Sequence, residues 1–132
     1  SPALLAQYGM PQTPVDLASW PSLGYGPPMD GHTWVLLGPE GAQATQHHHP
    51  RFVTTDMVTL RHAAGAGIGV VQLPLMMVRE QLANGNLIRL LPDWAPRREI
   101  IHVAFPTRRG LIPAVRALID HLAEQFADVE ED

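Results

Sequence analysis

The sequence predicts an α/β domain in which short helices and strands alternate and helices cover both faces of a mixed, mostly parallel sheet. The chain has 132 residues, of which 45% are hydrophobic, and this suits one domain with a buried core. Residues 51–91 read strand-helix-strand-helix-strand along the chain. Right-handed crossovers in that order make the strands parallel and place helices on the two faces.

The first two elements are expected to be short helices with the same start signal. The chain opens on Ser-Pro, an N-cap followed by proline at the first helical position, and Gly9 ends this helix. The signal returns at Thr13 and Pro14, where Asp16 stands at the third helical position. The pattern therefore predicts two short helices in place of one long helix.

Two strands are expected next, at residues 22–25 and 32–37. In the second of them, Trp34 and Leu36 alternate with other residues and should share one face. Residues 42–50 show no apolar period, so a loop or an irregular edge strand is expected there.

The repeated strand–helix pattern begins at residues 51–54, which are strand-like. Thr55 or Asp56 then caps a helix that ends in a run of glycines. The apolar run at 68–73 is typical of a strand buried on both faces.

A second helix is expected to start at Pro74 and to end at Asn84-Gly85, followed by a strand at 87–91. Its core side should carry Leu75, Met77, Val78 and Leu82. A further strand is expected at 99–105, and Pro113 starts the last helix. The apolar stripe of that helix has helical spacing and consists of Val115, Leu118, Ile119, Leu122 and Phe126.

Composition and charge argue against several classes of protein. Nine basic and thirteen acidic residues give a net charge of −4, whereas domains that bind nucleic acids usually have a basic face. The absence of cysteine excludes disulfides, thiol nucleophiles and cysteine-ligated metals. The N-terminal segment shows no secretory pattern, and the longest apolar stretch is too short for a bilayer, so no membrane association is expected.

Histidines invite a metal interpretation at one place in the chain. His47, His48 and His49 are consecutive, and His32 and His62 could add ligands. Three consecutive imidazoles in an extended chain cannot face one ion, however, because alternate side chains point in opposite directions. We therefore expect a solvated loop there and no metal site.

Two further patterns give little support to an enzyme or to a bound cofactor. Gly65, Gly67 and Gly69 follow a helix and precede a strand, whereas a dinucleotide-binding loop must follow a strand and open a helix. These glycines are expected to allow a tight turn and close packing of the helix on the sheet. No Gly-x-Ser-x-Gly motif or pair of carboxylates placed for acid–base chemistry is present.

The strongest candidate for binding is Thr54-Thr55-Asp56, where a strand end becomes a helix start. Backbone N–H groups and hydroxyls at such a position can bind a small anion or polar ligand. The same residues also suit simple helix capping, and the two roles are compatible. Because Asp56 would repel an anion, we expect it to cap the helix or to bind a partner group.

Three stretches in the correct order resemble the effector-binding domain of LysR-type transcriptional regulators. Residues 1–18 contain Ser-Pro-Ala-Leu-Leu-Ala-Gln-Tyr-Gly and Thr-Pro-Val-Asp-Leu-Ala, similar to the family's pair of short helices. Residues 52–74 are similar to its central strand-helix-strand segment. Three further segments are similar to the C-terminal signature of the family. They are Asn-Gly-x-Leu-Ile-Arg-Leu-Leu-Pro-Asp-Trp at 84–94, Phe-Pro-x-Arg-Arg at 105–109, and residues 113–122.

The resemblance implies a two-lobed domain like that of type II periplasmic binding proteins, of which this chain is a truncated part. Residues 1–106 would form the second lobe, and residues 107–132 would form a helix that belongs with the missing first lobe. That helix would expose its apolar stripe here, so self-association is expected. The family's effector lies between the lobes, and the wall from this lobe would be Tyr25, Gly26, Pro27, Thr54, Thr55 and Asp56.

The resemblance also implies a function and partners. The chain would sense a small polar or carboxylated metabolite in a cytoplasmic, homo-oligomeric regulator, without a cofactor or catalysis. DNA would be bound only through a helix-turn-helix that this chain lacks. The alternatives are a lobe of a transport-type solute-binding protein, which would need a secretory signal, and a small α/β enzyme, which would need convergent titratable groups.

Overall fold

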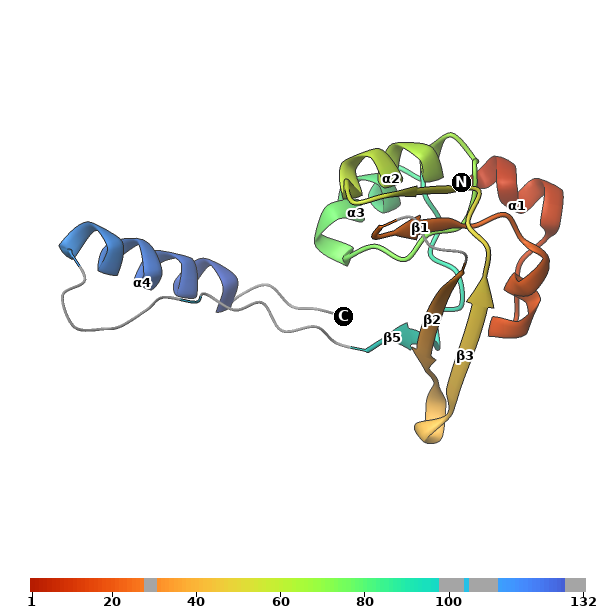
Figure 1. The fold of residues 1–132 in the computed structure, drawn as a ribbon, viewed down its shortest axis with the longest axis horizontal. Helices are drawn as coiled ribbons and strands as arrows, with labels where there is room; N and C mark the ends of the chain where they lie inside the picture. The colour runs from red at the N-terminus through yellow and green to blue at the C-terminus, as the bar shows by residue number, and fades with distance from the viewer. Residues whose placement is uncertain (28–30, 98–103, 105–111, 128–132) are drawn as a thin grey trace. The chain divides into compact units, whose positions relative to one another are not determined.

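The computed structural model describes residues 1–27, 31–97, 104 and 112–127, and the chain divides into two units, Ser1–Arg97 and Arg98–Asp132 (Figure 1). The first unit opens with the helix α1 (Pro2–Tyr8) and the 3₁₀ helix η1 (Pro14–Ser19). The Ser1 hydroxyl accepts a hydrogen bond from the Leu4 amide of α1 at 3.4 Å. The predicted pair of short helices is therefore confirmed.

The parallel sheet is formed by β1 (Leu23–Tyr25) and β4 (Phe52–Thr54). A third segment joins it at one bridge, where Ser22 pairs with Val70 in the parallel direction. The parallel arrangement is confirmed, but the strand predicted over residues 68–73 is wrong in extent. Only Val70 of that run takes part in the bridge, through backbone hydrogen bonds of 2.8 Å on either side.

An antiparallel sheet contains β2 (His32–Leu37), β3 (Gln43–His48) and β5 (Ala95–Pro96), in the order β3-β2-β5. Between β2 and β3, η2 (Pro39–Gly41) turns the chain. The expectation of a loop or an irregular edge strand at residues 42–50 is confirmed in part: β3 is an edge strand, but it is regular and pairs with β2 along its whole length. Its pattern is hidden from an apolar search, since the inward positions hold Ala44, Gln46 and His48.

Two helices follow in the first unit, α2 (Met57–Gly65) and α3 (Leu75–Ala83). Each starts and ends within a residue or two of the predicted positions. The strand expected at 87–91 is wrong, since these residues have no strand pairing. Their apolar character has another cause: Leu87 and Leu91 are buried in two different core clusters.

The two faces of β1 are covered by different parts of the chain. Leu23 is 1% exposed and belongs to a cluster with Leu60 of α2 and Val78 of α3. Ser22 points to the opposite face, because neighbouring side chains alternate, and there it contacts His48 of the hairpin β2–β3. At this point β1 has helices on one face and the hairpin on the other, whereas the sequence predicts helices on both faces.

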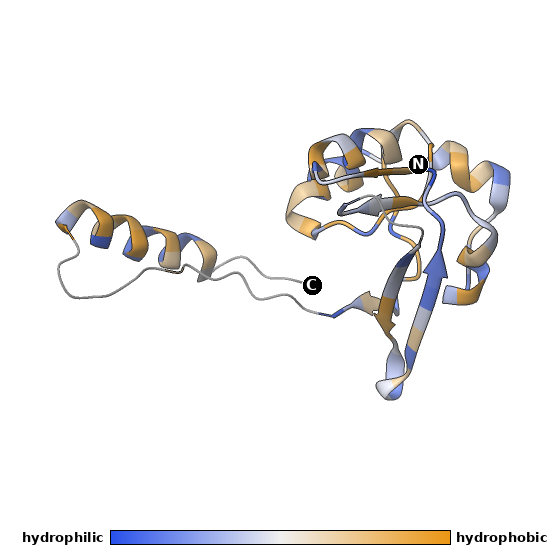
Figure 2. Cartoon of the chain, in the orientation of Figure 1, coloured by the Kyte–Doolittle hydropathy of each residue, from blue (hydrophilic) through white to orange (hydrophobic). Residues whose placement is uncertain are grey.

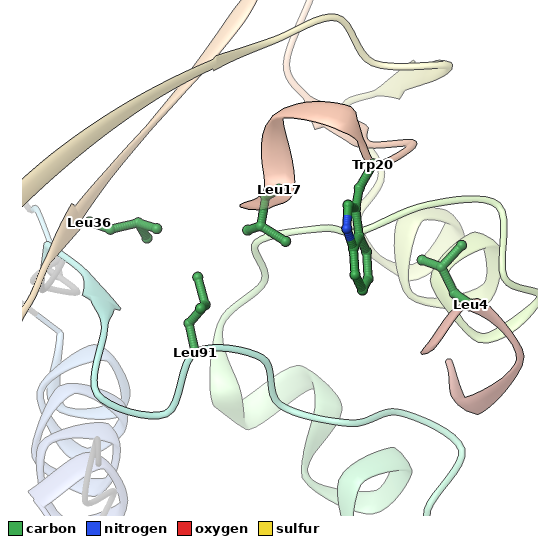
Figure 3. Close-up of a cluster of buried hydrophobic side chains, with 5 residues drawn as sticks. All are labelled: Leu4, Leu17, Trp20, Leu36 and Leu91. Atoms are coloured by element: carbon green, nitrogen blue, oxygen red, sulfur yellow. The ribbon is translucent and has the colours of Figure 1, made fainter. Parts of the chain in front are cut away.

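The second core cluster joins α1, η1 and β2 to the segment that follows α3. Figure 3 shows its buried side chains converging from these four parts of the chain. They are Leu4, Leu17, Trp20, Leu36 and Leu91. Trp34 also packs against them, which confirms that it shares a face with Leu36.

In the second unit the structure describes α4 (Pro113–Ala127) and Ala104. The final helix is confirmed, whereas the strand predicted over residues 99–105 lies outside the described residues apart from Ala104. Apolar residues recur along α4, as the hydropathy colours in Figure 2 show, and Leu118 and Phe126 are 56% and 43% exposed. Within the described residues, no helix combines the length and the apolar character needed to cross a membrane.

Candidate functional site

The structure brings the six predicted wall residues together at one end of the parallel sheet. In the register of β1 and β4, Tyr25 lies opposite Thr54. The Gly26 amide then donates a hydrogen bond of 3.1 Å to the Thr54 carbonyl, which ties the two strand ends together. Gly26 has a φ of 129°, a conformation that favours glycine, so the turn into Pro27 depends on this residue type.

Most of this wall is open to solvent in the described structure. Tyr25 is 51% exposed, Pro27, Thr55 and Asp56 are exposed, and Gly26 and Thr54 are partly buried. The accessible polar groups are mainly hydroxyls, from Tyr25, Thr54 and Thr55. Hydroxyls both donate and accept hydrogen bonds, so this surface suits a polar ligand.

Asp56 caps α2. Its carboxylate accepts hydrogen bonds from the Val58 and Thr59 amides at 3.0 and 3.3 Å, and from the Thr59 hydroxyl. These bonds, the one from the Thr59 hydroxyl first, hold the pKa of Asp56 below its usual range. Two amides at the start of α2 are therefore already occupied, and an anion placed there would meet a carboxylate.

Thr54 has a structural bond of its own beside the cap. Its hydroxyl oxygen accepts a hydrogen bond from the Asp56 amide at 3.1 Å. The hydroxyl proton of Thr54 is not used in that bond. Of the two roles weighed for Thr54-Thr55-Asp56, capping is present in the structure, and the hydroxyls are what remains for a ligand.

A shallow hollow lies elsewhere on the first unit. It has a volume of about 490 Å³, and its lining includes Tyr8, Met10, Val15 and Trp20, from α1 and η1 and the residues beside them. A smaller hollow of about 320 Å³ shares Met10 with it and includes Trp94. Neither of these two hollows includes a residue of the predicted wall.

The expectation of a solvated loop at the histidine run is wrong for His47 and His48, which lie in β3, and His48 is buried, whereas His47 and His49 are exposed to solvent. His48 is 7% exposed and stacks on Trp34 with ring centroids 3.8 Å apart. Its Nδ1 lies 2.8 Å from the Ser22 hydroxyl. Burial, followed by the neighbouring His32 and His49, lowers the pKa of His48 to about 4.

His48 could have been found from the sequence by one signal. It lies two residues after Gln46 and four after Ala44, on the face of β3 that turns inward against β2. His47 points the other way, is exposed, and its Nδ1 lies 2.9 Å from the Thr33 hydroxyl. In the part of the chain that the structure describes, no three histidines or carboxylates form a group that could hold a metal ion.

The expected role in a tight turn and in close packing is confirmed for Gly67 and Gly69 but not for Gly65, which has open space around it. Gly67 has a φ of 78° in the turn between α2 and the bridge. At Gly69, a Cβ would lie only 2.8 Å from the Pro21 carbonyl oxygen, so the two backbones touch directly. This close approach is what allows Val70 to bridge to Ser22.

Comparison with known proteins shows the family of domains to which the chain is similar. The family model of the LysR substrate binding domain matches residues 1–127. The HTH-type transcriptional activator AaeR of Escherichia coli (strain K12) is 33% identical over 125 residues, covering 95% of this chain and 40% of that protein. The HTH-type transcriptional regulator CrgA of Neisseria meningitidis serogroup B is 27% identical over 129 residues, which cover 97% of this chain and 42% of that protein. The chain thus spans about two fifths of the length of these relatives.

Solved structures agree with this placement. The regulatory domain of CrgA, a LysR-type regulator, matches with a TM-score of 0.73 and 26% identity, over 95% of this chain and 61% of that one. The regulatory domain of AphB from Vibrio vulnificus matches with a TM-score of 0.66 and 29% identity, over 74% of this chain and 48% of that one.

These matches decide between the classes left open by the sequence. The relatives are transcription regulators, so the domain is regulatory and not an enzyme. Its fold is that of the LysR regulatory domain, a mixed α/β fold of the type II periplasmic-binding kind. The chain belongs to the family of LysR substrate-binding domains, the effector-binding part of LysR-type transcriptional regulators.

Proposed function

We propose that this chain forms one wall of an effector cleft in a LysR-type regulator and that the ends of β1 and β4 contact the effector. The observation that carries the proposal is the parallel pairing of these strands, which joins Tyr25–Pro27 and Thr54–Asp56 at one edge. In open α/β sheets, ligands gather at the carboxyl ends of the strands. The open position of this wall fits a cleft that a second lobe completes.

The chemistry of the wall favours a polar or carboxylated metabolite. The hydroxyls of Tyr25, Thr54 and Thr55 can donate hydrogen bonds to carboxylate or hydroxyl oxygens. Asp56 keeps its charge and its bonds to α2, so a carboxylate would bind at the hydroxyls and not at the helix start. On this side of the cleft, the effector would then be bound mainly through hydrogen bonds from hydroxyl groups.

We assign residues 1–106 to the second lobe and residues 107–132 to a segment that packs with the first lobe. The apolar stripe of α4, with Val115, Leu118 and Phe126, supports this division, because such a stripe needs a partner surface to cover it. The match to the CrgA regulatory domain covers 95% of this chain yet only 61% of that structure, which leaves room for a further lobe. In the complete regulator the effector would shift lobe closure and subunit packing.

The proposal extends to the whole protein. The relatives carry HTH in their names, and we assign DNA binding to such a region outside this chain. The complete protein would be a cytoplasmic homo-oligomer that regulates transcription in response to its effector. This chain itself would contact the small molecule and not the DNA.

A pair of variants tests the wall in the complete regulatory domain. The probes are small mono- and dicarboxylic acids, each beside its neutral amide, titrated by calorimetry. Thr55→Val removes a hydroxyl at nearly constant shape and should weaken binding of an active probe about tenfold, since a hydrogen bond to a charged group contributes about 1.5 kcal/mol or more. Thr45→Val, an exposed change on β3, serves as the control and should leave affinity unchanged.

Two results would contradict the proposal. One is equal affinity of the Thr55→Val and wild-type domains for every active probe. The other is binding by the 132-residue chain as tight as that of the complete domain, because half a cleft should bind poorly.

A further inference from the structure

Strand β1 ends in the proposed effector wall, and two histidines of the hairpin β2–β3, His32 and His48, pack against it. Ser22 bonds to His48, and Gly24 lies against the ring of His32 and the ring of Pro50. A Cβ at Gly24 would lie 2.8 Å from Pro50 Cγ and 2.9 Å from His32 Cε1, so no space remains between strand and hairpin. The next residue along β1 is Tyr25, the first residue of the wall.

His48 is buried and the neighbouring His32 is partly buried, and one ring nitrogen of each lacks a hydrogen-bond partner. Their ring centroids lie 5.8 Å apart, one from β2 and one from β3. The Nε2 atoms of His32 and His48 are both buried and have no hydrogen-bond partner. A neutral ring tolerates this, but a protonated ring would hold a buried N–H donor and a positive charge that nothing satisfies.

Among the described residues, no acidic side chain on β1, β2 or β3 offsets such a charge. The residues of β1, β2 and β3 include no aspartate or glutamate. On β3 the ionisable side chains are His47 and His48, with His49 next in the chain, and β2 adds His32. The nearest acid on η1, which packs against β3, is Asp16, whose carboxylate accepts bonds of 2.9 and 2.8 Å from the Gln12 and Thr13 amides.

Lowering the pH therefore favours opening of the junction. The charges that act on His48 come from His32 and His49, and both disfavour its protonation, as does its burial. His48 binds a proton more readily when the hairpin moves away and exposes its ring to water. Opening relieves the burial that disfavours this protonation, so lower pH shifts the equilibrium towards the open junction.

We propose that the junction between β1 and the hairpin β2–β3 is a proton-sensitive element, and that protonation of His48 loosens it together with the wall at the end of β1. Its consequence for effector binding rests on the proposed function. The loosening itself needs no ligand, so it can be measured and can fail independently of that function.

Two backbone amides report on the junction and the wall separately. The Arg51 amide donates to the Ser22 carbonyl at 2.8 Å, where the hairpin returns to β1. The Gly26 amide donates to the Thr54 carbonyl at 3.1 Å, within the wall. The Ala66 amide, bonded to the His62 carbonyl at 2.9 Å at the end of α2, reports on the rest of the unit.

The experiment is amide hydrogen exchange by NMR on the 132-residue chain, with protection factors corrected for the intrinsic pH dependence. Between about pH 7.5 and pH 4.5, Arg51 and Gly26 should lose more than about tenfold in protection relative to Ala66. His48→Phe keeps an aromatic ring on Trp34 but cannot be protonated, and it should abolish this difference. His47→Gln, an exposed change on the same strand, should leave the difference as in the wild type.

Three results would overturn the proposal. Arg51 and Gly26 could follow Ala66 at every pH, the difference could persist in His48→Phe, or Arg51 could lose protection while Gly26 keeps it. If His48→Phe does not fold, the imidazole of His48 is titrated by NMR in the wild type. Its midpoint must then coincide with the loss of Arg51 protection, and a separate midpoint overturns the proposal.

Discussion

Gly69 lies where the chain leaves α2 and meets the backbone of Pro21. A Cβ there would come within 2.8 Å of a carbonyl oxygen and 3.0 Å of two carbonyl carbons, and backbone atoms cannot rotate away as a flexible side chain can. The residue therefore sets how closely the segment after α2 approaches β1. This close contact is possible only because glycine has no Cβ.

Gly69→Ala is expected to lower the free energy of unfolding by about 1–3 kcal/mol, the usual cost of forcing extra volume into a packed site. Gly65→Ala is the matched control, since nothing lies within 4 Å of a Cβ there and the residue ends α2. Alanine has a higher helix propensity than glycine, so Gly65→Ala should leave the free energy of unfolding unchanged or raise it slightly. Urea unfolding followed by circular dichroism measures both, and equal stability of the two variants would contradict the packing argument.

Asp56 acts on stability through its bonds to the start of α2. Asp56→Ala should lower the melting temperature, whereas Asp56→Asn, also a good N-cap residue, should change it less. The pKa of Asp56 is lowered in the folded state, so its stabilising effect is present above its ordinary pKa of 3.8 and is lost as pH falls through the lower folded value.

Thermal unfolding of both Asp56 variants at neutral pH and in acid checks this. The difference between wild type and Asp56→Ala should be largest at neutral pH and shrink below about pH 3.8. A difference that grows in acid would contradict the capping role.

At the scale of elements, the helices were the easiest part to predict from the sequence. Their caps are local signals: Ser1 before α1, Asp56 before α2 and Asn84 after α3 all occupy the positions expected of them. Strands depend on partners that are distant in sequence, and there the prediction failed twice. Residues 68–73 and 87–91 are apolar because they reach core clusters, and only Val70 among them pairs with a strand.

The hairpin shows the opposite failure. The inward positions of β3 hold small or polar residues, so its alternation is invisible to a search for apolar side chains. His48 is buried only because Trp34 stacks on it and Ser22 bonds to it, and both contacts need the fold. The six wall residues were predicted from the family resemblance and from strand ends, and the register of β1 with β4 is what brings them together.

The exposed face of α4 gives a prediction at the same scale. Leu118→Glu should reduce self-association of the 132-residue chain, because Leu118 is 56% exposed on the apolar stripe. Ala117→Glu, at an exposed neighbouring position outside that stripe, is the control. Light scattering across a concentration series should show oligomers for the wild type and the control, and fewer for Leu118→Glu. A wild-type chain that stays monomeric at high concentration would contradict the assignment of α4 to a missing lobe.

At the scale of the whole molecule, family and fold are established by a match over residues 1–127 and by the CrgA regulatory domain. The chain covers about two fifths of its curated relatives. In our account, the effector cleft and the DNA contacts would involve parts beyond these 132 residues. What this chain supplies to the regulator, in our account, is a wall of hydroxyls on two parallel strands. A histidine junction behind that wall would make it sensitive to pH.

The most direct test is to locate an effector on the isotope-labelled regulatory domain by NMR, with the same carboxylic acids and their neutral amides as probes. The account predicts that an active probe shifts the amide signals of Gly26 and Thr55 most among the residues of this chain. Shifts centred instead on the hollow beside Tyr8, Met10 and Trp20, with Gly26 and Thr55 unchanged, would contradict it.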